Sequence, residues 1–242
     1  MRIQRSELKN LGLTLGLRVK GLDLDIYKYE KVGGTFVIKK DHQAVLTPDG
    51  KMFSTTDESL AVLLCKDLAV YGPNPWDSVS YVTFHCSYMD FGSKIAKSDL
   101  IANILHGYRT GWDIAVQQLV EFDSQYTSST VDANPMGEGI FVDPTLFFGP
   151  LQNVTTIQTW LETLSTRALC SIQCCGAAFQ SIHICYCLLQ EHPQWPILGL
   201  AQGIIRYSQP LHKLLLVNGN PKATEDRVVS FLEKVRKYAS YP

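Results

Sequence analysis

The chain has no excess charge of either sign. Its 242 residues include 22 lysines and arginines and 23 aspartates and glutamates, which gives a formal net charge of −1 at pH 7. Proteins that bind nucleic acid through overall basicity usually have an isoelectric point above about 9, so the sequence predicts no nucleic-acid partner. Glycine (17) and proline (11) are too few for a collagen-like or low-complexity chain. With 45% hydrophobic residues, the sequence predicts a folded protein with a substantial core.

Targeting and membrane signals are also scarce. Residues 1–20 lack the apolar core that precedes a secretory cleavage site, but they hold five basic residues and one acidic residue. We therefore expect a basic N-terminal segment over 1–21, which is either an organelle-targeting segment or a surface arm. The 23 uncharged residues between Arg167 and Glu191 are interrupted by polar side chains and lack a basic cluster at either end. We expect a buried helix there and no transmembrane span.

Sequence motifs of common enzymes are missing. The chain contains no Gly-x-Ser-x-Gly elbow, no phosphate-binding Gly-x-x-x-x-Gly-Lys and no Gly-x-Gly-x-x-Gly at the start of a helix. His85 and Cys86 are adjacent, but nothing in the sequence assigns a residue that would orient a Cys–His pair, so we expect a structural cysteine beside a packed histidine. The sequence predicts a non-enzyme with no catalytic residues and no cofactor.

Five of the seven cysteines fall between Cys170 and Cys187. A disulfide-rich secreted domain would be shorter, so this usage favours a reducing compartment. Cys170, Cys174, His183, Cys185 and Cys187 are therefore candidate zinc ligands. Structural zinc sites use two short ligand pairs that a turn brings together, whereas we expect one continuous helix over about 166–190, where Cys185 and Cys187 point about 200° apart. The sequence therefore predicts no metal site.

Hydrophobic patterning predicts an α+β protein with a small N-terminal β-rich domain and a C-terminal α-helical domain. Short antiparallel strands are expected at 22–27, 35–38 and 44–46. Thr55 and Glu58 have the spacing of a capping box before an apolar helical stripe over 60–68. Further helices are expected near 94–108, 112–119, 154–164, 166–190, 197–207 and 228–235. We divide the chain into the basic segment 1–21, a β-rich domain with one helix over 22–90, and an α-helical domain over 91–242.

Charge is unevenly distributed along the chain. The stretch from Gln125 to Gln190 holds five charged residues in 66 positions. Two interpretations remain open: the stretch is a partner-binding face, since interface cores are depleted of charge, or it is the middle of the core.

Four segments carry a family resemblance. The run from Phe36 to Pro48 is similar to a strand–turn–strand hairpin that ends in Thr-Pro, and 60–68 is similar to the helix that follows, with Asp67 where Glu is usual. Trp112 and Asp113 begin a Trp-Asp helix. Residues 168–189 follow a long helix of small residues, with Gln180 where Lys is usual.

In this order and spacing, over about residues 22–190, the segments resemble the mitochondrial ATP synthase assembly factor 2 family. Its members are chaperones that hold the α subunit of the catalytic sector before it joins β. The resemblance implies a β-rich N-terminal domain and a helical C-terminal domain. Here Ile204–Tyr207 replaces the acidic stretch of the family, which identifies the chain as a divergent member. The expected partner-binding residues are Asp67, Trp112, Asp113, Gln180, Ile205 and Arg206.

The expected function is that of an assembly chaperone in the mitochondrial matrix. Its partner would be the ATP synthase α subunit, whose apolar β-contacting face it would cover. The alternative is a chaperone fold that serves as a non-catalytic structural or accessory subunit of a large mitochondrial complex. In that case the partner would be another subunit of that complex.

Overall fold

The computed structural model describes residues 26–71, 80–109, 113–128, 144–190, 196–207 and 220–242. The basic segment 1–21 and nearly all of the strand pattern at 22–27 lie outside these residues.

The N-terminal part is a small antiparallel sheet centred on β2. Its strands are β1 (Tyr27–Val32), β2 (Thr35–Lys40), β3 (Gln43–Ala44) and β4 (Ser54–Thr55), and β2 pairs with each of the other three. Gly33 and Gly34 have φ values of 55° and 90°, which the two-residue turn between β1 and β2 requires and which glycine adopts without strain. Phe36 and Ile38 of β2 are buried in the core, and helix α2 (Glu58–Tyr71) packs against β1 and β2.

The start of α2 differs from the capping box that the sequence suggested. The Asp57 carboxylate accepts a hydrogen bond from the Leu60 amide at 2.9 Å, so Asp57 is the N-cap. Thr55 lies in β4, and its hydroxyl accepts instead from the Asp57 amide at 3.2 Å. The Thr55–Glu58 prediction was wrong because the aspartate between them competes for the same helix amides.

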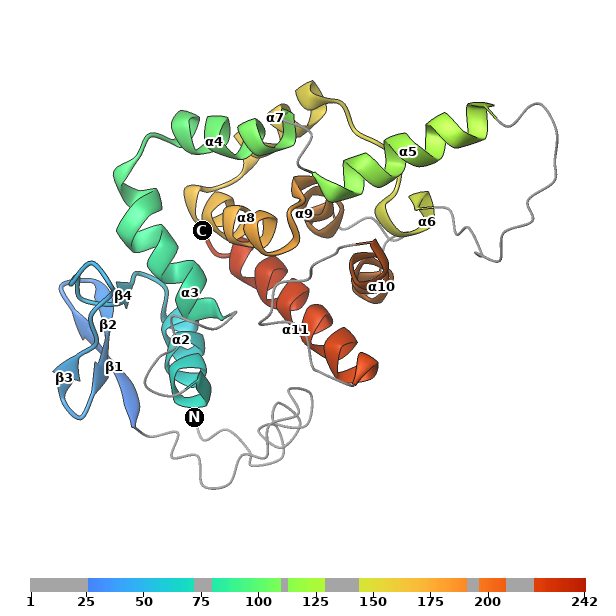
Figure 1. The fold of residues 1–242 in the computed structure, drawn as a ribbon. Helices are drawn as coiled ribbons and strands as arrows, with labels where there is room; N and C mark the ends of the chain where they lie inside the picture. Colours follow the sequence, from blue (N-terminus) through green and yellow to red (C-terminus); the bar gives the residue numbers. More distant parts are fainter. Residues whose placement is uncertain (1–25, 72–79, 110–112, 129–143, 191–195, 208–219) are drawn as a thin grey trace.

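The remaining elements are helical, which confirms the α+β class. In chain order they are α3 (Tyr81–Cys86), the π-helical turn η2 (Ser87–Phe91), the 3-10 turn η3 (Gly92–Lys94), α4 (Lys97–Arg109), α5 (Ile114–Ser128), α6 (Thr145–Phe148), α7 (Val154–Thr163), α8 (Thr166–Phe179), α9 (Ile182–Leu189), α10 (Ile197–Tyr207) and α11 (Pro221–Ala239). Figure 1 shows the sheet at one end of the molecule with α2 and α3 beside it, and α8 among the remaining helices. Helix α8 contacts η2, η3, α4, α9 and α11, so it is the centre of the helical part.

The expected continuous helix over 166–190 is two helices. Gln180 ends α8 in a left-handed conformation, with φ of 53°, and the Ser181 hydroxyl caps α9 by accepting from the Ile184 amide at 3.1 Å. The apolar periodicity continues across this break and therefore conceals it. Among the helices that the structure describes, none combines the length and apolar character needed to cross a membrane.

One cluster of buried side chains connects the sheet with the helical part. It runs from Phe36 in β2 through Leu64 in α2 and Cys170 in α8 to Tyr238 near the end of α11. The cluster is continuous across position 90, where we divided the chain.

The close approach of α10 to α6 can be tested at two glycines of the same helix. A Cβ atom at Gly203 would lie 2.6 Å from Cβ of Phe147, whereas one at Gly199 would meet nothing closer than 3.7 Å. We expect Gly203→Ala to lower the free energy of unfolding by about 1–3 kcal/mol, because it overpacks the α6 contact. Gly199→Ala should leave it unchanged or raise it by up to about 1 kcal/mol, the gain in helix propensity. Equal midpoints of the two variants in urea unfolding would contradict this packing.

Candidate functional site

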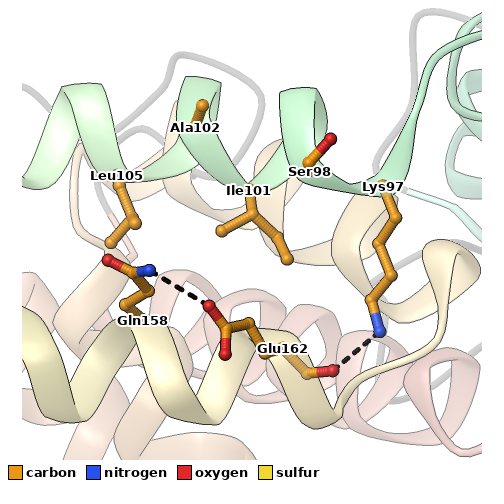
Figure 2. A pocket seen from close by; sticks show the side chains of 7 residues that line it. All are labelled: Lys97, Ser98, Ile101, Ala102, Leu105, Gln158 and Glu162. Carbon is orange, nitrogen blue, oxygen red and sulfur yellow. Dashed lines mark hydrogen bonds between the residues drawn. The ribbon is translucent and has the colours of Figure 1, made fainter.

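The first candidate site is a groove between α4 and α7. It has a volume of about 450 Å³ and is lined by Lys97, Ser98, Ile101, Ala102, Leu105, Gln158 and Glu162. Figure 2 shows its polar groups: Lys97 Nζ of α4 donates across the groove to the Glu162 carbonyl of α7 at 2.7 Å, and Gln158 Nε2 donates to the Glu162 carboxylate, one turn further along α7, at 3.0 Å. Ile101 and Leu105 are buried. Of the two hydrogen bonds, the Lys97 bond ties α4 to α7, and it reaches the backbone of Glu162 rather than its carboxylate.

A second groove lies between α7 and α9 and has a volume of about 510 Å³. Its lining is uncharged and rich in hydroxyl groups: Asn153, Thr155, Thr156, Thr159, Trp160, Thr163, Tyr186 and Gln190. Trp160 is buried and meets Tyr186 edge to face, with ring centres 5.2 Å apart. The two rings pack against each other, which stabilises the α7–α9 contact.

The third candidate is an exposed apolar pair on the hairpin that follows β3. Leu46 and Met52 face each other in an isolated β-bridge, with 51% and 60% of their surfaces exposed. The hairpin is held on the sheet by hydrogen bonds from the Ile38 amide to the Phe53 carbonyl and from the Val45 amide to the Ile38 carbonyl, each 2.9 Å long. We call Leu46 and Met52 the hairpin pair.

The tip of this hairpin is also fixed to η2. The Asp90 carboxylate accepts from the Thr47 hydroxyl at 2.7 Å and from the Asp49 amide at 3.2 Å. Lys51 Nζ donates to the Met89 carbonyl, and Lys94 Nζ pairs with Asp49 at 2.6 Å. The hairpin pair is therefore presented in a defined position on both sides of an anchored turn.

Asp67 is buried, with 6% of its surface exposed, and is bound within the chain. Its carboxylate pairs with Lys234 Nζ of α11 at 3.4 Å and accepts from the Val82 amide of α3 at 3.3 Å. Burial raises the pKa of Asp67, while the charge of Lys234 opposes that rise. Asp67 thus joins α2, α3 and α11, and its place is in the interior rather than on a partner-binding surface.

Asp113 is buried as well, and it closes the junction between α5 and α9. Its carboxylate accepts from the Ser181 hydroxyl at 2.6 Å and from the amides of Ile182 and His183 at 2.7 and 2.9 Å. A fourth bond, from the Val116 amide at 3.2 Å, caps α5. Negative charge at two helix N-termini is favourable. Because Asp113 is only 2% exposed, its role here is to connect two helices.

The other expected partner-binding residues lie apart from these two. Gln180 is exposed and sits at the turn between α8 and α9. Ile205 is half-buried and packs on the core, while Arg206 is exposed with its guanidinium 5.9 Å from the centre of the Tyr207 ring. Trp112 lies outside the described residues. The structure does not gather the described members of this set into one surface.

Helices α8 and α9 place much of the charge-poor stretch inside the molecule. Eight residues of α8 and six of α9 are buried. For 166–189, burial in the core therefore accounts for the low charge, and of the two interpretations the core fits this part.

The histidine at position 85 is packed in the core, as the sequence indicated, but its two partners come from distant elements. His85 is buried in α3, where Nε2 donates to the Ser54 carbonyl of β4 at 2.8 Å and Nδ1 accepts from the Tyr238 hydroxyl of α11 at 2.9 Å. Burial lowers the pKa of His85 to about 4, although the bond to Ser54 opposes the shift. The imidazole is thus neutral at pH 7 and connects the sheet to the C-terminal helix. No local pattern indicated these partners, which lie 31 and 153 residues away along the chain.

The cysteines form no disulfide, since all seven are free thiols. Burial raises the pKa of Cys170 and of Cys187 to about 12, so both remain protonated. Within the described ranges, no three histidine, cysteine or acidic side chains come together in a way that could hold a metal ion.

Comparison with known proteins adds no relative. No family model, no curated protein and no solved structure matches the chain.

The Asp67–Lys234 pair can be tested by a double-mutant cycle. Either Asp67→Asn or Lys234→Met should lower the free energy of unfolding by about 3–5 kcal/mol, because each leaves a buried charge without its ion-pair partner. The double variant should lose less than the sum of the two. Lys222→Met, at an exposed position of the same helix, is the control and should change little. Additive losses in the cycle would show that the pair does not interact.

His85 predicts a pH dependence of stability. The folded pKa of about 4 lies below the unfolded value of 6.5, so the unfolded state binds the proton first and stability falls as the pH decreases from about 6.5 to 4. At about 1.4 kcal/mol per pKa unit, the loss is on the order of 3 kcal/mol. Urea unfolding of the wild type and of His85→Gln, which keeps a donor for Ser54, should show a shallower slope in the variant. Equal slopes would exclude His85 as the titrating group.

Proposed function

We propose that the chain is an assembly chaperone that binds the α subunit of the catalytic sector of mitochondrial ATP synthase through the hairpin pair. The observation that carries the proposal is the pair itself: Leu46 and Met52 are apolar, adjacent and more than half exposed on an anchored hairpin. Leu46 and the first residues of the turn belong to the first segment of the family resemblance, whereas Met52 lies beyond its end at Pro48. A chaperone for a subunit with an apolar assembly face needs such a complementary apolar contact.

Pre-organisation supports this assignment. A binding surface whose conformation is already fixed loses little conformational entropy when a partner binds. Asp90 holds the hairpin at Thr47 and at Asp49, and two backbone bonds attach it to β2. A few well-placed apolar anchors can supply most of the binding free energy of an interface. The proposed mechanism is reversible coverage of the client's apolar face, with no chemical step.

The order of elements is a second support. The resemblance implies a β-rich N-terminal part followed by a helical part, and the fold has this arrangement (Figure 1). Since Asp67 and Asp113 are buried within the chain, the contact with the client is assigned to the hairpin rather than to these carboxylates.

The test is capture of the α subunit by the purified full chain. We expect Leu46→Lys combined with Met52→Lys to weaken binding at least about tenfold, equivalent to about 1.4 kcal/mol, without changing the melting temperature. Leu198→Lys, which replaces an equally apolar side chain that is 48% exposed on α10, is the matched control and should bind as the wild type does.

Three results would count against parts of this proposal. Unchanged binding by the hairpin double variant would remove the hairpin from the contact. Failure of the wild type to capture the α subunit would overturn the chaperone function. Permanent retention in one large mitochondrial complex, in place of transient association with the α subunit, would favour the accessory-subunit alternative.

A further inference from the structure

Arg167 is a buried cation with two guanidinium nitrogens that make no hydrogen bond to the described residues. It is the second residue of α8, and 5% of its surface is exposed. Within the part of the chain that the structure describes, Nε and Nη1 have no hydrogen-bond partner. A guanidinium cannot lose its charge in a protein, and an unpaired buried charge is strongly unfavourable. The two nitrogens can therefore donate to a hydrogen-bond acceptor that carries a negative charge.

The neighbours of Arg167 do not supply that acceptor. The Tyr88 ring covers one side of the guanidinium, with its centre 5.0 Å from Cζ. The nearby Asp57 carboxylate is engaged at Oδ1 with the Ser59 hydroxyl and the Leu60 amide. These two bonds are the main reason for the low pKa of Asp57, to which the charge of Arg167 adds. His85, also within the field of Arg167, is bonded at both ring nitrogens.

The start of α8 adds a second attraction for negative charge. The first amides of a helix have no partner within it and carry the positive end of the helix dipole. At α8 the Ser165 hydroxyl caps only the Ala168 amide, at 3.2 Å. Side chains in the first turn of a helix lean towards its N-terminus, so the guanidinium and the dipole act on the same region.

We propose that Arg167 and the first turn of α8 bind a small oxyanion of the phosphate or carboxylate type. Nε and Nη1 donate to its oxygens, and Tyr88 covers the guanidinium. The low exposure of Arg167 restricts the site to small ions. The site lies where η2 meets α8, so the bound ion would hold these two elements together. This assignment is independent of the chaperone function.

Thermal unfolding of the full chain, titrated with sodium phosphate at constant ionic strength, tests the site. At tenfold excess over the dissociation constant we expect a rise in Tm of about 3–5 °C, which continues to grow with the logarithm of the phosphate concentration. Arg167→Met should abolish the rise, and Arg167→Lys should weaken it, because a lysine lacks the planar donor fork. Arg206→Met, which removes an exposed guanidinium that also lies beside a tyrosine, should respond as the wild type does.

Sodium acetate and sodium chloride distinguish the ligand chemistry. A response to phosphate alone assigns a phosphate site, and a response to acetate assigns a carboxylate site. An equal response to chloride, or an undiminished response in Arg167→Met, would overturn the proposal. If Arg167→Met does not fold, isothermal titration of the wild type and of Arg167→Lys with phosphate decides the question, and absence of binding to the wild type up to tens of millimolar would also overturn it.

Discussion

The Asp113 carboxylate is the contact on which the arrangement of the central helices depends. It receives four hydrogen bonds, one that caps α5 and three from Ser181, Ile182 and His183 at the start of α9. A buried carboxylate is tolerated only when donors surround it. The chain must therefore leave α8 at Gln180, turn, and begin α9 where Asp113 can reach its amides. The position of α9 then sets that of α6, since His183 Nε2 and Cys187 Sγ both donate to the Phe148 carbonyl, at 2.9 Å each.

Local sequence patterns predicted the helices and strands better than the residues at which they begin and end. The helices near 197–207 and 228–235 and the strand at 35–38 agree with α10, α11 and β2 because each has its own periodicity and its own end signals. The break at Gln180 was missed because the apolar pattern continues through it, although Ser181 is a residue typical of N-caps. Asp57 was passed over because a neighbouring Thr–Glu spacing gave a competing cap.

Contacts between residues far apart in the sequence limited how much of the candidate site could be predicted. Asp67 and Lys234 are 167 residues apart, and His85 and Tyr238 are 153 apart, so no short-range pattern could pair them. The resemblance marked Asp67 and Asp113 as partner-binding, yet carboxylates at helix termini in a small domain often serve the chain itself. The low charge of residues 125–190 was correctly noticed, but composition alone cannot distinguish a covered surface from a core. The burial of α8 and α9 makes that distinction for their part of the stretch.

The burial of these polar groups bears on how the proposed chaperone would distinguish its partner. The buried polar groups Asp67, His85 and Asp113 are bonded within the chain, so they contribute to the fold. The hairpin pair consists of two apolar side chains, which give affinity but little directional selectivity. Under the proposed function, selectivity for one partner would then depend on the position of the hairpin relative to the helical part. That position is set by Asp90 at the hairpin tip and by His85 between β4 and α11. Under the proposed function, polar contacts that are not themselves part of the hairpin pair would influence binding by setting the position of these two exposed apolar side chains.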